Sequence, residues 1–169
     1  MRKIALSISE IKDIEKREFL RLGDSFKLME QAGEACAKQI IKIYKKNRFI
    51  VVCGPGNNGG DGLILSSCLS EHGKEVDLYC LGKGSYKGDS LKAYKKNKLK
   101  KKPLDELNVN QDAVIVDALF GIGLNKKIEG LFKDCVDKIN NSKLKVIAVD
   151  IPSGIYGDNG KVMGEAVRA

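Results

Sequence analysis

The chain has 169 residues, of which 43% are hydrophobic and 31% are charged, and its formal net charge is +8. These values are typical of a soluble globular protein and predict one domain with a core of its own. No run approaches the length of a membrane-spanning helix, and residues 1–6 lack the apolar core of a signal peptide. A membrane-spanning protein is therefore excluded as an interpretation of this sequence.

Cysteine usage indicates the compartment. The five cysteines are odd in number, widely scattered and mostly set in apolar segments: Cys36, Cys53, Cys68, Cys80 and Cys135. This pattern predicts buried, reduced thiols rather than disulfide bridges or a zinc site. We therefore expect a cytoplasmic protein.

Two helices are predicted before the first strand. Ser7-Ile8-Ser9-Glu10 matches a capping box, and the helix that it opens would end at Gly23-Asp24. Its expected inward residues are Ile8, Ile11, Phe19 and Leu22. A second helix starts near Ser25, and the residues at helical spacing on its expected core face are Met29, Ala32, Cys36, Ile40 and Ile43. Small residues on the second helix would also permit close contact with another subunit: Ala32, Gly33 and Ala35.

The segment Phe49–Gly62 is the most informative part of the chain. Five residues of buried-strand character, Phe49–Cys53, lead into Gly54–Gly62, where five of nine residues are glycine, and a helical run Leu63–Leu69 follows. A glycine loop between a strand and a helix exposes backbone N–H groups to a ligand, and the helix start behind it favours negative charge. This order of strand, glycine loop and helix predicts a binding site for a phosphate or a dinucleotide.

A hydride-transferring NAD enzyme is a weak interpretation of this loop. Gly54–Gly59 satisfies G-x-G-x-x-G, but the acidic residue at the expected distance, Asp77, lies inside the strand Glu75–Cys80 rather than at its end. Asp61 would repel phosphate if it caps the helix. With the amides of Asn57 and Asn58, the loop suits a mixed site of polar ligand, cation and backbone contacts.

The remaining elements alternate between helix and strand. A helix is expected from Asp89 or Ser90 to before Pro103, strands at residues 113–116 and 146–149, and a helix at 131–140. Continuous apolar strands separated by helices predict a doubly wound, mainly parallel, Rossmann-like α/β sheet with helices on both faces. In such sheets the ligand lies beyond the carboxyl ends of the strands, so we expect the loops at Gly54, Asp117 and Asp150 to share one rim.

The positive charge is concentrated in Lys92–Lys102, interpreted as the end of a helix and its exit. A nucleic-acid surface is conceivable, but Tyr94 is the only aromatic residue in the run. We favour a solvated lysine-rich face, which would also attract an anionic dinucleotide.

Four ordered motifs together resemble the YjeF N-terminal domain family, which contains the NAD(P)H-hydrate epimerases. They are Leu28–Gly33, Gly54–Gly62, Asp117–Gly123 and Asp150–Gly154, and they span nearly the whole chain. The resemblance implies an isomerase of nicotinamide nucleotide repair that interconverts the R and S forms of hydrated NADH and NADPH. It also implies one domain over residues 1–169, with family C-terminal strands that would follow Ala169.

The resemblance also implies a set of site residues. Potassium would be bound by Asn58, Asp117 and Ser153, an all-oxygen set that suits a hard cation but does not by itself select potassium over magnesium. The implied substrate-binding residues are Asn57, Asn58, Gly59, Gly60, Asp61, Gly121, Ile122, Gly123, Leu124, Asn125, Lys126, Lys127 and Asp150.

We expect Asp150 to be the general acid/base. His72, the only histidine, is expected to lie far from the rim, and Cys53 is the only cysteine expected there, in a packed position. Asp61 is expected to cap a helix and stay ionised, whereas Asp150 precedes Pro152, which has no N–H to stabilise its charge. Its pKa is therefore the one expected to rise.

The expected partners follow the resemblance: hydrated NADH or NADPH as substrate, a homodimer, an NAD(P)H-hydrate dehydratase that acts with this chain or is fused beyond residue 169, and no membrane or nucleic acid. The alternative interpretation is a non-catalytic nucleotide- or RNA-binding interaction module on the same fold, as in family members fused to RNA-decapping scaffolds.

Overall fold

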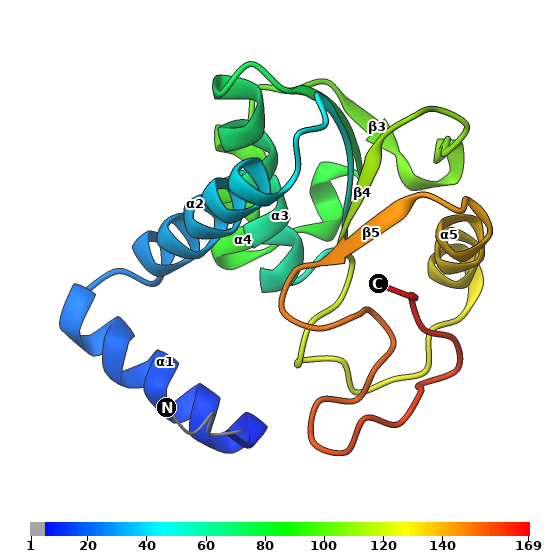
Figure 1. Ribbon diagram of the computed structural model, residues 1–169. Helices are drawn as coiled ribbons and strands as arrows, with labels where there is room; N and C mark the ends of the chain where they lie inside the picture. The colour runs from blue at the N-terminus through cyan, green and yellow to red at the C-terminus, as the bar shows by residue number, and fades with distance from the viewer. Residues whose placement is uncertain (1–5) are drawn as a thin grey trace.

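The computed structural model describes residues 6–169, and its centre is a sheet of five parallel strands (Figure 1). Their order in the sheet is β3-β2-β1-β4-β5. The strands are β1 (Arg48–Cys53), β2 (Glu75–Cys80), β3 (Lys101–Pro103), β4 (Val114–Ala118) and β5 (Lys145–Ala148). The predicted parallel α/β sheet is confirmed.

Helices cover both faces of this sheet. One face packs against α2 (Ser25–Ile43), α3 (Asn57–Glu71) and α4 (Gly88–Lys96), and the other against α5 (Gly130–Asn141) and the short helix η2 (Leu104–Glu106). The alternation along β1 shows why: Phe49 and Val51 point to the first core, whereas Ile50 and Val52 point to the second. The remaining helices are α1 (Ile8–Leu22) and η1 (Lys83–Ser85).

Two strands, β4 and β3, differ from the sequence-based expectation. β4 continues to Ala118, so Asp117 is a buried strand residue rather than the first residue of a loop. The short strand β3 was missed, because its three residues, Lys101–Pro103, carry no apolar pattern. Pro103 is tolerated there because β3 lies at the edge of the sheet, where a missing N–H breaks no ladder bond.

The glycine-rich segment is mostly helix, contrary to the predicted nine-residue loop. Only Gly54–Gly56 is irregular, and α3 begins at Asn57 with Gly56 as N-cap. A Cβ atom on Gly59 would lie 1.8 Å from the carbonyl oxygen of Gly54. Glycine is therefore required here by the close approach of the helix to the strand end, as well as by the turn. Asp61 lies in the second turn and caps nothing, so that part of the prediction was wrong.

The expected core face of α2 is rotated in the structure. The buried residues are Met29, Gly33, Ala37 and Ile40, whereas Ala32 and Ile43 are exposed. A Cβ atom on Gly33 would lie 2.7 Å from Cβ of Ile64 on α3. Gly33 thus serves the packing of α2 on α3 within the chain and is not available to another subunit.

Three of the seven lysines in Lys92–Lys102 form ion pairs within the fold. Nζ of Lys92 lies 2.7 Å from Oδ1 of Asp89, and Nζ of Lys102 lies 2.6 Å from Oδ1 of Asp77. Lys96 pairs with Glu30 on α2. These pairs favour the interpretation as a solvated face, and one of them occupies Asp77.

Several smaller predictions are confirmed. Ser7 and Glu10 form the capping box of α1, and Gly23 ends that helix in the left-handed conformation. The five cysteines are free, and all but the half-buried Cys36 are buried. Separately from these predictions, no helix among the described residues is long and apolar enough to cross a membrane.

Candidate functional site

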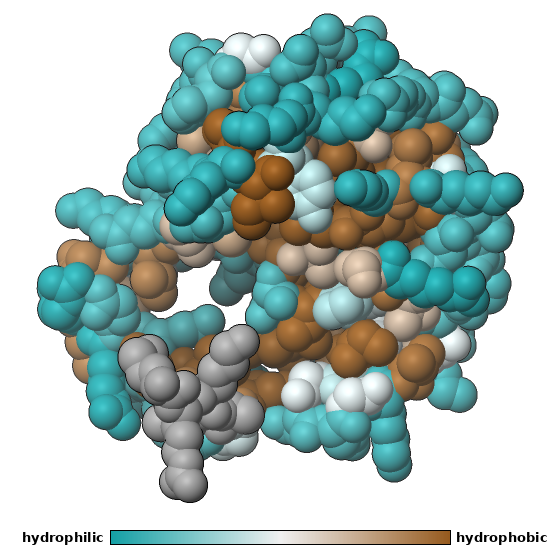
Figure 2. Space-filling view, viewed as in Figure 1, coloured by the Kyte–Doolittle hydropathy of each residue, from teal (hydrophilic) through white to brown (hydrophobic). Residues whose placement is uncertain are grey.

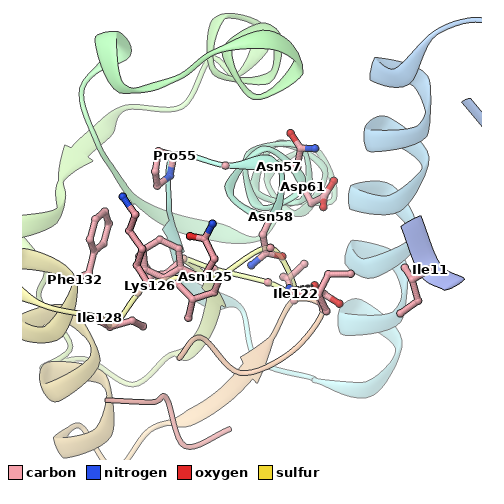
Figure 3. A pocket seen from close by; sticks show the side chains of 18 of the residues that line it. Ile11, Pro55, Asn57, Asn58, Asp61, Ile122, Asn125, Lys126, Ile128 and Phe132 are labelled. Carbon is pink, nitrogen blue, oxygen red and sulfur yellow. Dashed lines mark hydrogen bonds between the residues drawn. The ribbon is translucent and has the colours of Figure 1, made fainter. Parts of the chain in front are cut away.

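A pocket of about 780 Å³ opens at the carboxyl ends of β1 and β4 (Figure 3). The connections from β1 run outward to β2 and β3 on one side, whereas β4 and β5 lie on the other. The strand order therefore reverses between β1 and β4, the point at which parallel α/β sheets leave room for a ligand. The expected rim is confirmed as a cavity.

Most of the predicted substrate-binding residues line this pocket. They are Asn57, Asn58, Asp61, Gly121, Ile122, Gly123, Leu124, Asn125, Lys126, Lys127 and Asp150. Gly59 and Gly60 do not line it: Gly59 faces the end of β1, and a Cβ atom on Gly60 would lie 2.6 Å from the side chain of Met29. Asp117 and Ser153 are buried and do not line the pocket either.

Asp150 is held in an uncommon backbone conformation. Its φ of 67° is in the left-handed region, which non-glycine residues adopt rarely and often at functional sites. Its Oδ2 accepts a hydrogen bond of 2.7 Å from the backbone N–H of Ile122. The expectation that its charge lacks a backbone N–H donor was therefore wrong, because the donor comes from the β4–α5 loop.

Gly121 makes room for the Asp150 carboxylate. A Cβ atom on Gly121 would lie 2.3 Å from Oδ2 of Asp150 and 3.3 Å from Cγ of Asn58. Any side chain at this position would displace one of the two polar groups. The glycine of the second motif is thus needed to bring Asn58 and Asp150 together.

Asp61 is the carboxyl group whose pKa is raised, to about 7. Burial is the main cause, and the negative charges of Asp150 and Glu15 add to it. The sequence predicts instead that Asp61 stays ionised and that Asp150 is the group with the raised pKa. The structure overturns the expectation for Asp61, because it is half-buried within α3 and receives no capping hydrogen bond.

Asp117 and Ser153 form a buried polar network beneath the pocket. Oγ of Ser153 donates to Oδ1 of Asp117 at 2.6 Å, and the Ser153 N–H donates to Oδ2 at 2.8 Å. The N–H of Leu119 also donates to Oδ1 at 3.2 Å. Burial nevertheless raises the pKa of Asp117, since these bonds offset the cost of desolvation only in part.

The side chain of Asn58 gives the observation that fits cation binding. Its Oδ1 and Nδ2 are both buried, and neither has a hydrogen-bond partner. A buried amide without partners costs about 1–3 kcal/mol, so such groups usually contact an ion or a ligand. An amide oxygen, a buried carboxylate and a hydroxyl make a donor set of the kind that hard cations take.

Several lining residues were not predicted as site residues. Helix α1 contributes Ile11, Lys12 and Glu15, and α2 contributes Ala32 and Cys36. Cys36, not Cys53, is therefore the cysteine at the pocket, and burial raises the pKa of its thiol. The apolar faces of the first two helices were visible in the sequence, but they were assigned to the core.

An aromatic pair lines the side of the pocket next to α5. The rings of Phe120 and Phe132 meet edge to face with centroids 4.8 Å apart, and both line the cavity. His72, as expected, is far from this site, at the C-terminal cap of α3.

Comparison with known proteins identifies the family. The profile of the family described as YjeF-related protein N-terminus matches residues 25–169. The chain belongs to this family. Among its YjeF-family relatives, the NAD(P)H-hydrate epimerase of Lentilactobacillus buchneri is 34% identical over 98% of this chain and 80% of its own. The NAD(P)H-hydrate epimerase of Limosilactobacillus reuteri is 38% identical over 86% of this chain and 71% of its own.

Longer relatives combine two activities. The bifunctional NAD(P)H-hydrate repair enzyme Nnr of Thermofilum pendens is 37% identical over 96% of this YjeF-family chain, which spans only 33% of that enzyme. A crystal structure of yeast ynu0 shares the fold, with a TM-score of 0.77, 23% identity, and coverage of 97% of this chain and 77% of its own.

Proposed function

We propose that this chain is an NAD(P)H-hydrate epimerase, which interconverts the R and S forms of hydrated NADH and NADPH. Relatives with that name align with most of the chain. The observation that carries the proposal is the meeting of Asn58, Asp61 and Asp150 at the switch-point pocket. The pocket, about 780 Å³, is large enough for a dinucleotide ring system and its phosphates.

The two carboxyl groups supply the proton chemistry. Burial, together with the negative charges of Asp150 and Glu15, raises the pKa of Asp61 to about 7, so Asp61 can hold a proton near neutral pH. One carboxyl group gives this proton to the hydroxyl on the hydrated carbon, which leaves as water with its bonding electron pair. Water then adds to the other face of the resulting cationic ring, and the carboxylate takes its proton back.

We assign the acid/base role to Asp150 and a supporting role to Asp61. Asp150 is exposed in the pocket, and the N–H of Ile122 fixes its direction. The left-handed backbone at Asp150 is the kind of strain that is retained where a group must be aimed. A positioned carboxyl group of this kind typically accelerates proton transfer by about a hundredfold to ten-thousandfold.

We propose Asn58, Asp117 and Ser153 as the residues that hold a potassium ion. The unpartnered amide of Asn58 and the buried carboxylate of Asp117 support a cation at this place. When bound, the cation would supply positive charge that offsets the burial of Asp117. It would also tie the start of α3 to the loop after β5.

The function is tested by supplying purified chain with the R form of hydrated NADPH and following formation of the S form. We expect interconversion well above the uncatalysed rate. No acceleration by a folded chain that binds the nucleotide would favour the alternative, a non-catalytic binding module. Ion pairs between acidic residues and three lysines of Lys92–Lys102 weaken the alternative of an RNA-binding surface.

The partners and the compartment follow from the same proposal. An epimerase of this kind acts with an NAD(P)H-hydrate dehydratase. The bifunctional relatives are an example in which the two activities are fused in one chain. Five free thiols support a reducing compartment such as the cytoplasm. A homodimer is also proposed, through surfaces other than Gly33, and light scattering at high protein concentration tests it.

A further inference from the structure

Helix α1 crosses one side of the pocket as a strap that is attached at its two ends. Figure 1 shows α1 standing apart from the sheet and its covering helices, and Figure 2 shows an opening between it and the body of the molecule. None of its residues is buried, and Leu20 is 71% exposed. An amphipathic helix with no buried residue is not held by a core of its own.

The N-terminal end of the strap is attached to the loop after β5. The backbone N–H of Ile8 donates to Oδ1 of Asp158 at 3.1 Å. The side chain of Ile8 lies over Gly157, where a Cβ atom would be 2.9 Å from Cδ1 of Ile8. At the other end, Gly23 ends α1 and Asp24 caps α2 by accepting from the N–H of Phe26 at 2.9 Å. Both ends are therefore fixed, and the middle is left over the pocket.

The middle of the strap faces the pocket with one side. Ile11, Lys12 and Glu15 line the cavity. Glu15 lies three residues after Lys12 and four after Ile11, and these spacings put neighbours on one side of a helix. Arg17 and Asp13 lie on the opposite side of the helix by the same 3.6-residue period and do not line the cavity. The strap thus presents one cation and one anion to the ligand space.

The ammonium group of Lys12 forms no ion pair with an acidic side chain of the described residues. Among the described residues, no carboxylate lies within 4.0 Å of its Nζ. Within residues 6–169, the other lysines that line the pocket are Lys126 and Lys127 on the β4–α5 loop. Figure 3 shows Lys126 and Ile11 of the strap on opposite sides of the pocket.

The pocket needs these cations because it is rich in carboxylates. Glu15, Asp61, Glu129 and Asp150 line it, and their charges repel the phosphates of a dinucleotide. Among the described residues that line the cavity, Lys12 is the cation on the α1 side, and Lys126 and Lys127 come from the β4–α5 loop. A lysine over this side can neutralise a phosphate and hold it away from the carboxylates.

We propose that α1 is part of the substrate site and that Lys12 binds a phosphate group of the dinucleotide from the side opposite Lys126. This inference rests on the proposed function for the identity of the ligand, and it adds a contact from a helix that lies before the family match at residue 25. Lys12 is thus a binding residue that takes no part in proton transfer.

The test compares nucleotide binding by Lys12→Ala, Lys12→Arg and Arg17→Ala variants of the full chain, with NADP⁺ as the calorimetric probe. Loss of one charge-assisted contact is expected to raise the dissociation constant about tenfold in Lys12→Ala. Lys12→Arg should keep most of the affinity because it keeps the charge. Arg17→Ala removes an equal charge from the outer side of the same helix and should bind as the wild type does.

Kinetics separates this role from a structural one. With hydrated NADPH as substrate, Lys12→Ala should raise KM by a similar factor while kcat changes less than twofold. Equal affinity of Lys12→Ala and the wild type, or an equal loss in Arg17→Ala, would overturn the inference. A wild-type chain that binds NADP⁺ through Lys12 but does not epimerise would refute the proposed function alone. A wild-type chain that does not bind NADP⁺ would refute both.

Discussion

Ser153 donates two hydrogen bonds to Asp117, one from its Oγ and one from its backbone N–H, across 36 residues of sequence. These bonds link the end of β4 to the loop after β5. They hold a carboxylate that has almost no access to water, and Asn58 in the same candidate cation site has an amide without partners. The arrangement leads to the first prediction.

Potassium should stabilise the folded chain, because a ligand that binds only the native state raises its stability by mass action. At a hundredfold excess over the dissociation constant the gain is about 2.7 kcal/mol, or about 5–10 °C in Tm for a domain of this size. Asn58→Ala should abolish the response, whereas Asn57→Ala, at the neighbouring exposed position, should retain it. Identical melting in sodium, potassium and magnesium would count against the site.

Asp150→Asn should fold and bind NADP⁺, because its exposed side chain supports no core contact. Its rate of epimerisation should fall by at least about a hundredfold, the lower limit for a lost general acid or base. Asp61→Asn should lose less activity if Asp61 only supports Asp150. Near-normal turnover in Asp150→Asn would contradict the assignment of Asp150 as the acid/base. A larger loss of activity in Asp61→Asn than in Asp150→Asn would reverse the two roles.

The stability of the chain should depend on Asp61 between about pH 4 and pH 7. The pKa of Asp61 is raised from 3.8 to about 7 in the folded state, so the folded protein holds a proton that the unfolded chain releases near pH 4. The contribution of Asp61 to the free energy of unfolding is therefore present at low pH and is lost as the pH rises through that window. The loss is at most about 4 kcal/mol, since each pKa unit corresponds to about 1.4 kcal/mol.

Asp61→Asn removes this loss. Urea denaturation across the pH range should show the variant gaining stability relative to the wild type from pH 4 to pH 7, with no further gain above. Asp13→Asn, on the outer side of α1, is the matched control and should show no such trend. A flat difference between Asp61→Asn and the wild type would contradict the raised pKa.

Gly33→Ala should destabilise the chain by about 1–3 kcal/mol, the usual cost of an extra methyl group in a packed contact. The new Cβ atom would meet Ile64 at 2.7 Å and the backbone oxygen of Asp61 at 2.8 Å. Gly84→Ala is the control, because no atom lies within 4 Å of the added carbon. Equal urea midpoints for the two variants would show that α2 and α3 separate without cost.

The parallel sheet and its ligand edge were predictable because their signals are local. The apolar runs around Ile50, Ile115 and Ile147 alternate with helical segments, and parallel strands must end at one edge. The motifs at Gly54, Gly121 and Asp150 follow those strand ends directly, so their meeting at one pocket followed from topology.

Other features depend on packing between distant parts of the chain, and only the tertiary structure decided them. The pKa of Asp61 depends on burial and on the charges of Asp150 and Glu15, which lie on other elements. The start of α3 at Asn57 depends on how closely Gly59 approaches the end of β1. The inner face of α1 looked like a core face, since periodicity marks an apolar stripe but does not say whether a core or a ligand pocket lies beneath it.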